Sequence, residues 1–120
     1  MILHITSKDE WQSAQARGEY RVPSLEIEGF IHTSTAKQVL AVANAFYRGK
    51  NGLVLLVIDE TRVGPEVRWE APAGSSAAGI SPSDLFPHIY GPLNLEAVVR
   101  ALDFEPDPAG TFSLPPLEWM

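Results

Sequence analysis

The chain of 120 residues contains no cysteine. This absence excludes a disulfide scaffold, a thiolate nucleophile and a zinc site with cysteine ligands. Its length matches that of one domain. We therefore expect residues 1–120 to form a single domain, with a core over about residues 1–102 and a proline-rich tail at 103–120.

Long apolar runs are also missing. The longest run, residues 53–58, has the length of a strand, whereas a membrane helix needs about 20 apolar residues. The first residues lack the basic segment and apolar stretch of a secretion signal. We expect a cytoplasmic protein with no membrane partner.

Basic residues are few. Nine Lys and Arg residues stand against fifteen Asp and Glu residues, which gives a net charge of −6, and the basic residues form no cluster. Because nucleic-acid binding depends on Lys and Arg contacts to phosphates, this charge argues against nucleic acid as the main partner. The sequence leaves the oligomeric state open.

Turn residues and hydrophobic periodicity divide the first third of the chain. Ser7 and Glu10 have the spacing of a capping box, and Gly18 is a typical helix stop. We expect a strand at residues 2–6, a helix from Ser7 to Gly18, extended chain or loop at 19–29 with a break at Pro23, and a strand at 30–33.

The remaining elements are predicted in the same way. Thr35 and Gln38 suggest the start of a helix at residues 36–47, which ends before Gly49. We expect strands at 53–58 and 67–70, helix or strand at 93–102, and a loop at 71–82, which is either a flap over a site or an insertion without function. This mixture without a regular βαβ order indicates an α+β fold.

The three histidines share one local pattern. Each precedes a hydroxyl side chain by two positions, as His4 and Thr6, His32 and Ser34, and His88 and Tyr90. Residues i and i+2 of a strand point to the same face, so each segment presents an imidazole and a hydroxyl together. Such groups can orient a ribose, hold a phosphate or move a proton. A single histidine on a strand is usually structural, and only the three together suggest a site.

Carboxylates give a weaker signal. Glu70 would share a strand face with Arg68, and a glutamate at a strand end is usually solvated or ion-paired. Glu26 and Glu28, in the segment before His32, look solvated as well. Three neutral imidazoles and a water can form a zinc centre, but these histidines lack the close spacing of metal motifs. We expect no metal.

Seven segments make the chain resemble domain-of-unknown-function family 952. In order they are HITS (4–7), PSL (23–25), GFIHTS (29–34), ANAFY (43–47), LLVID (55–59), RWE (68–70) and FPHIYGPLN (86–94). The resemblance runs from the N-terminus to about residue 114.

That family is similar in fold to the ADP-ribosyltransferases, including the RNA 2′-phosphotransferases that also consume NAD. The resemblance implies a split antiparallel β-sheet. It further implies that His4 and Thr6 hold a ribose. Protein-modifying transferases place a glutamate at the third motif, where this chain has His88 and Tyr90, with Glu70 as a substitute.

In the same resemblance, His32, Thr33 and Ser34 position the nicotinamide ribose or a phosphate, and His88 or Tyr90 acts as acid or base. The implied function is binding of NAD or a related ribose-phosphate nucleotide, with transferase or NAD glycohydrolase activity. Two alternatives stay open: a nucleotide-binding module without catalysis, and a metal-dependent hydrolase that uses the three histidines.

Overall fold

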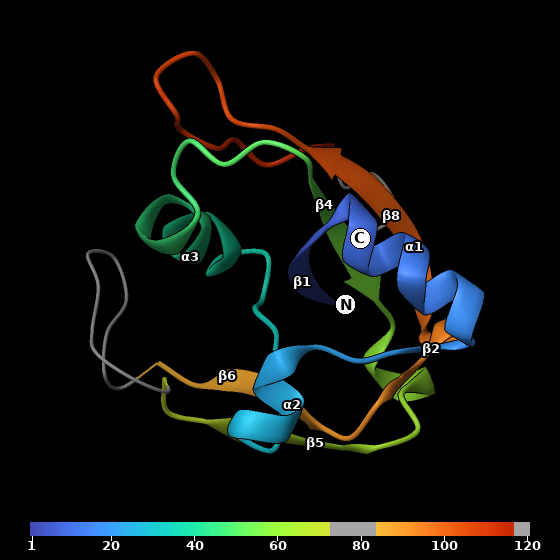
Figure 1. Cartoon of the computed structure of the whole chain (residues 1–120). Coiled ribbons are helices and arrows are strands. Elements are labelled where there is room, and N and C mark those ends of the chain that lie inside the picture. The colour runs from blue at the N-terminus through green and yellow to red at the C-terminus, as the bar shows by residue number, and fades with distance from the viewer. Residues whose placement is uncertain (73–83, 117–120) are drawn as a thin grey trace.

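The computed structural model describes residues 1–72 and 84–116 of the chain. They form one α+β domain of short helices and antiparallel sheets (Figure 1). The helices are α1 (Lys8–Arg17), α2 (Pro23–Ile27) and α3 (Val39–Phe46), with 3₁₀ turns at η1 (Glu60–Arg62) and η2 (Leu95–Ala97). The strands are β1 (Ile2–Ser7), β2 (Glu19–Tyr20), β3 (Ile31–His32), β4 (Leu53–Ile58), β5 (Glu66–Glu70), β6 (Phe86–Tyr90), β7 (Leu93–Asn94) and β8 (Val98–Phe104).

The strands form three antiparallel sheets. The first has the order β1-β4-β8, the second pairs β2 with β7, and the third has the order β3-β6-β5. The predicted strand at 53–58 is confirmed as β4, the centre of the first sheet, and all six of its residues are buried. A fully apolar strand fits this position because both of its faces are covered.

Two apolar clusters lie on opposite faces of the first sheet. One contains Ala14 of α1, Tyr20 of β2, and Ile31 and Ile89 of the third sheet. The other contains Val39 and Ala43 of α3 together with alternate residues of β1 and β4. Helices α1 and α3 thus cover different faces, and the third sheet packs through its apolar face against the first cluster.

The first helix forms as its sequence predicts. The Ser7 side chain accepts a hydrogen bond from the Glu10 amide at 3.1 Å, and Gly18 ends the helix with a φ of 92°. Glycine reaches this left-handed conformation without the penalty that a side chain carries. The predicted cap, helix and stop are all confirmed.

Two boundaries differ from the predictions. The segment 19–29 contains β2, which agrees with the predicted extended chain, but it also contains the helix α2, which was not predicted. Pro23 begins α2, where its missing amide costs no helical hydrogen bond. Helix α3 begins at Val39 instead of residue 36. Thr35 lies before a separate turn, in which its carbonyl accepts from Gln38 and Val39, although the Gln38 side chain does cap the Thr35 amide at 2.9 Å.

Residues 93–102, for which the sequence predicted either helix or strand, are mainly strand. These residues form β7, the turn η2 and most of β8. No helix of the described residues is both long and apolar enough to cross a membrane. Of the predicted loop at 71–82, residues 73–82 lie outside the described part of the chain.

The segment after β8 is irregular but anchored. Phe112 is 3% exposed and stacks on Phe104 with ring centroids 4.7 Å apart. The Asn44 carboxamide of α3 accepts a hydrogen bond from the Phe112 amide at 2.8 Å. This aromatic side chain therefore belongs to the second apolar cluster.

We predict that Phe112→Ala lowers the free energy of unfolding by about 3–5 kcal/mol, because it removes a buried ring and leaves a cavity beside Phe104. Chemical denaturation measures the change. Leu114→Ala, at a position 38% exposed, serves as the control and should change stability by less than about 1 kcal/mol. Equal effects of both substitutions would show that the segment does not anchor the fold.

Candidate functional site

The three histidines line one cavity of about 780 Å³. Thr6, Thr33 and Ser34 line the same cavity, together with aromatic side chains from α3 and from β6. The strands β1, β3 and β6 each supply one of the histidines. The fold thus brings together imidazoles that are 28 and more residues apart in the chain.

Strand register places His32 beside His88. The two residues are direct cross-strand partners in the pairing of β3 with β6. Their ring centroids lie 5.7 Å apart, as expected for side chains that share one face of an antiparallel pair. Ile31 and Ile89 are partners in the same register, and they point to the core from the opposite face.

A short bridge joins β1 to the segment that follows β3. The Leu3 amide donates to the Ser34 carbonyl at 2.7 Å, and the Ser34 amide donates to the Leu3 carbonyl at 2.8 Å. Successive residues of a strand direct their amide and carbonyl groups to alternate edges. The amide and carbonyl of Ile5, two residues beyond Leu3, therefore point to the same edge, and Ile5 lines the cavity.

Both ring nitrogens of His4 are used inside the protein. Nδ1 contacts the His32 carbonyl, and Nε2 lies 2.7 Å from the Tyr20 hydroxyl. Since a carbonyl only accepts, Nδ1 must carry the proton, and Tyr20 then donates to Nε2. His4 therefore fixes the backbone of His32 and has no ring nitrogen left for a ligand.

Burial controls the protonation of this pair. His4 is 8% exposed, and burial lowers its pKa to about 4. Burial likewise raises the pKa of the Tyr20 phenol, and a hydrogen bond with Thr6 opposes that rise. Both side chains are neutral near pH 7, as the shared hydrogen bond requires.

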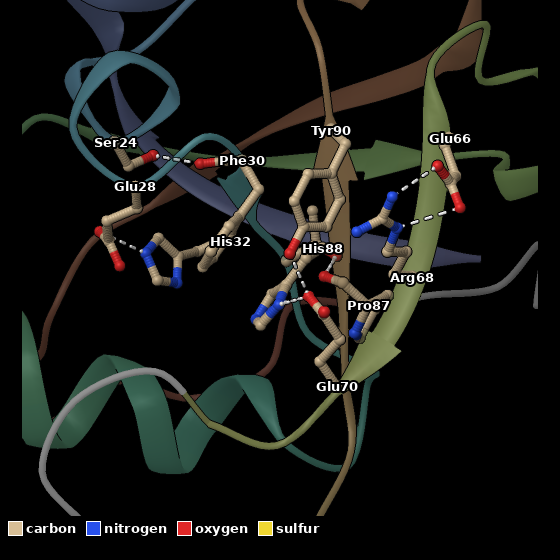
Figure 2. A network of polar contacts seen from close by, with 11 residues as sticks. Ser24, Glu28, Phe30, His32, Glu66, Arg68, Glu70, Pro87, His88 and Tyr90 are labelled. Atoms are coloured by element: carbon tan, nitrogen blue, oxygen red, sulfur yellow. Dashed lines mark hydrogen bonds and ion pairs between the residues drawn. The ribbon is translucent and has the colours of Figure 1, made fainter.

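Glu70 contacts His88 and Tyr90. Its Oε1 accepts from the Tyr90 hydroxyl at 2.5 Å and from His88 Nδ1 at 2.8 Å, and all three side chains converge in Figure 2. These two hydrogen bonds, first that from Tyr90, hold the pKa of the Glu70 carboxyl below its ordinary value. The hydrogen bond between Tyr90 and Glu70 also raises the pKa of the Tyr90 hydroxyl.

Glu70, expected to be solvated or ion-paired, forms an imidazole–carboxylate pair with His88. Arg68 pairs with Glu66, with Nε 3.0 Å from the carboxylate, and its guanidinium lies over the Tyr90 ring. The sequence did not show that β6 lies next to β5. In that register Arg68 is opposite His88, so Glu70 reaches His88 along a diagonal.

Glu28 is exposed, as predicted, and it also contacts His32. It follows the last residue of α2, and its Oε1 lies 2.9 Å from His32 Nε2. Gly29, with a φ of 90°, turns the chain from α2 toward β3 and so brings Glu28 back to His32. Glu26 lies on the exposed surface of α2, as predicted.

Phe30 and Tyr20 are site residues that the sequence analysis missed. The Phe30 ring stacks on His88 with centroids 4.1 Å apart and meets the His32 ring edge-on at 4.9 Å. Phe30 stands two residues before His32, and this spacing in an extended chain could have predicted that the two side chains lie on the same face. Tyr20 lies in a short strand, and no local pattern marks it.

Three predicted site residues are placed differently from the others. Thr33 lines the cavity, but its hydroxyl donates to the Pro87 carbonyl at 2.5 Å. Glu70 and Tyr90 are not among the described residues that line the cavity, and they meet it only through His88. Among the described residues, no group of three or more His, Asp or Glu side chains is arranged to hold a metal ion.

Comparison with known families gives one match. Residues 5–101 match the model of the family DUF952, which is described as a protein of unknown function. No curated protein matches the chain.

Solved structures of protein CC0527 from Caulobacter crescentus are similar over almost the whole chain. Its crystal structure is 33% identical, covers 94% of this chain and 93% of its own, and has a TM-score of 0.80. A double-mutant crystal structure gives the same values. The solution structure of that protein covers 92% and 89% with a TM-score of 0.74.

We predict that the stability of the fold falls as the pH is lowered from 6.5 to 4. In this range the unfolded chain binds a proton at His4, with an ordinary pKa of 6.5, while the folded chain, with a pKa of about 4, does not. The contribution of His4 to this loss is about 3 kcal/mol. Denaturation at pH 7 and pH 4.5 measures the total, and His4→Asn should reduce the difference.

Ring NMR gives a direct check of the same shift. The His4 ring should stay neutral, with the proton on Nδ1, down to about pH 4. A titration midpoint of His4 near 6.5 would contradict the assignment.

Proposed function

The chain belongs to the family DUF952, and we propose that its histidine-lined cavity binds NAD or a related ribose-phosphate nucleotide. The observation that carries this proposal is the convergence of three imidazole-bearing strands on one cavity of about 780 Å³. Ligand sites usually measure about 300–1,000 Å³ and combine apolar walls with a few polar groups.

The chemistry of the lining suits a nucleotide. Phe46, Tyr47 and Phe86 offer aromatic surface for a planar base, and Ser34 and Glu28 offer a hydroxyl and a carboxylate for ribose oxygens. The Ile5 amide and carbonyl at the open edge of β1 form a donor–acceptor pair. Such a pair is complementary to a carboxamide like that of nicotinamide.

Charge in the cavity favours a ligand with few negative groups. Lys50 is the one Lys or Arg among the described lining residues, whereas Glu10 and Glu28 both line the cavity. A ligand with an added 2′-phosphate would bring two more negative charges near these carboxylates. The proposed ligand is therefore NAD or ADP-ribose, and NADP and RNA 2′-phosphates are disfavoured.

Catalysis in this proposal depends on His88. Its Nδ1 donates to Glu70, so Nε2 is the nitrogen left to act as a base. In NAD hydrolysis the bond from the ribose C1′ to nicotinamide breaks, and nicotinamide leaves neutral with the bonding electrons. A water oxygen bonds to C1′, and its proton passes to His88 Nε2. Glu70 keeps the imidazole oriented and stabilises the imidazolium that forms.

We predict that NAD and ADP-ribose bind to the purified protein, and that His32→Ala weakens binding by about 1–3 kcal/mol through a lost hydrogen bond. Isothermal titration calorimetry measures this. NADP should bind at least about tenfold more weakly than NAD. Val99→Ala, on β8 and outside the cavity, is the control. Absence of binding for both nucleotides would remove the proposal.

We predict that Glu70→Gln lowers NAD turnover about 10²-fold, because His88 loses the carboxylate that orients it. Released nicotinamide, separated by chromatography, measures turnover. Nucleotide binding should be unchanged, since Glu70 is not part of the described lining. Normal binding with no turnover in the unchanged protein would identify a binding module without catalysis.

A further inference from the structure

The site contains two imidazole–carboxylate pairs. His32 Nε2 lies 2.9 Å from Glu28, and His88 Nδ1 lies 2.8 Å from Glu70. The pairs come from the strands β3, β5 and β6 and from Glu28, which follows α2, and Figure 2 shows them on either side of the Phe30 ring. A carboxylate on one ring nitrogen fixes the tautomer and leaves the other nitrogen to exchange protons with a ligand.

The second nitrogen of each ring is open. His32 Nδ1 and His88 Nε2 have no hydrogen-bond partner among the described residues. Both histidines line the cavity, and the side chain of His32 is 45% exposed.

Packing holds the two rings in a fixed relation. Phe30 is 8% exposed, stacks on His88 at an interplanar angle of 20° and contacts the His32 ring edge-on. The backbone of His32 is held by the His4 imidazole, and Thr33 is bonded to Pro87 next to His88. With ring centroids 5.7 Å apart, the rings can contact two oxygens of one small group.

We propose that His32 and His88 act as a general acid–base pair on a ribose phosphodiester. A water oxygen bonds to phosphorus and gives its proton to one imidazole. The bond from phosphorus to a ribose oxygen breaks, and that oxygen takes the bonding electrons and a proton from the other, protonated imidazole. The product is a phosphomonoester, and exchange with solvent restores the two rings.

The paired arrangement meets a requirement of this bond that the glycosidic bond of NAD does not have. Nicotinamide leaves NAD as a neutral molecule and needs no acid, so one base suffices there. A ribose oxygen is a poor leaving group until it is protonated, so a phosphodiester requires both an acid and a base. Lys50 in the same cavity supplies a cation for the phosphate.

The test uses the full chain with 2′,3′-cyclic AMP in the presence of EDTA, followed by ³¹P NMR. We expect conversion to the nucleoside monophosphate, with a bell-shaped dependence of kcat on pH. His32→Ala and His88→Ala should each lower kcat about 10²–10⁴-fold and remove one limb of the profile. Glu28→Gln should lower kcat by about tenfold, whereas Glu26→Gln, on the exposed surface of α2, should not change it.

Two results would overturn the inference: no conversion by the unchanged protein, or conversion that survives both histidine substitutions. Circular dichroism checks that each variant is folded, and the exposed side chain of His32 makes its substitution the safer one. NAD binding is measured separately. If the unchanged protein binds NAD but does not convert the cyclic phosphate, this inference alone is removed; if it converts the cyclic phosphate but does not bind NAD, only the proposed NAD site is removed.

Discussion

The contact on which the site depends is the hydrogen bond from the His4 imidazole to the His32 carbonyl. It joins β1 of the first sheet to β3 of the third, beside the two bonds between Leu3 and Ser34. Because His4 is buried and neutral, this contact needs no counter-ion, and Tyr20 satisfies its second nitrogen. This attachment holds the backbone of His32, whose cross-strand partner is His88.

This arrangement separates the histidines by role. His4 acts on the backbone, whereas His32 and His88 each keep one open nitrogen and a carboxylate partner. An imidazole–hydroxyl pattern repeated three times in the sequence thus corresponds to one histidine with both ring nitrogens bonded inside the protein and two histidines with one ring nitrogen bonded to a carboxylate. Residue type and strand alternation were the same in all three cases, and only the neighbouring strands distinguish them.

Local sequence patterns predicted the helices and strands that depend on interactions between neighbouring residues. The cap at Ser7, the stop at Gly18 and the apolar strand β4 follow from side chains within a few residues of each other. The contacts of Glu70 and Glu28 could not be predicted in this way. The first depends on the register of β5 against β6, and the second on the turn at Gly29 that follows a helix of five residues. The first is decided by the pairing of distant segments, and the second by the backbone conformation of a local turn.

No single continuous segment of the chain contains the whole site. The contributing strands begin at Ile2 in β1 and end at Tyr90 in β6. Glu28 and His32 are four residues apart, whereas Glu70 and His88 lie on separate strands. A fragment that ended after β4 would retain His4 and His32 but lose Glu70 and His88. The site therefore cannot be transplanted as a short peptide motif, and any exchange between related proteins would have to carry nearly the whole domain.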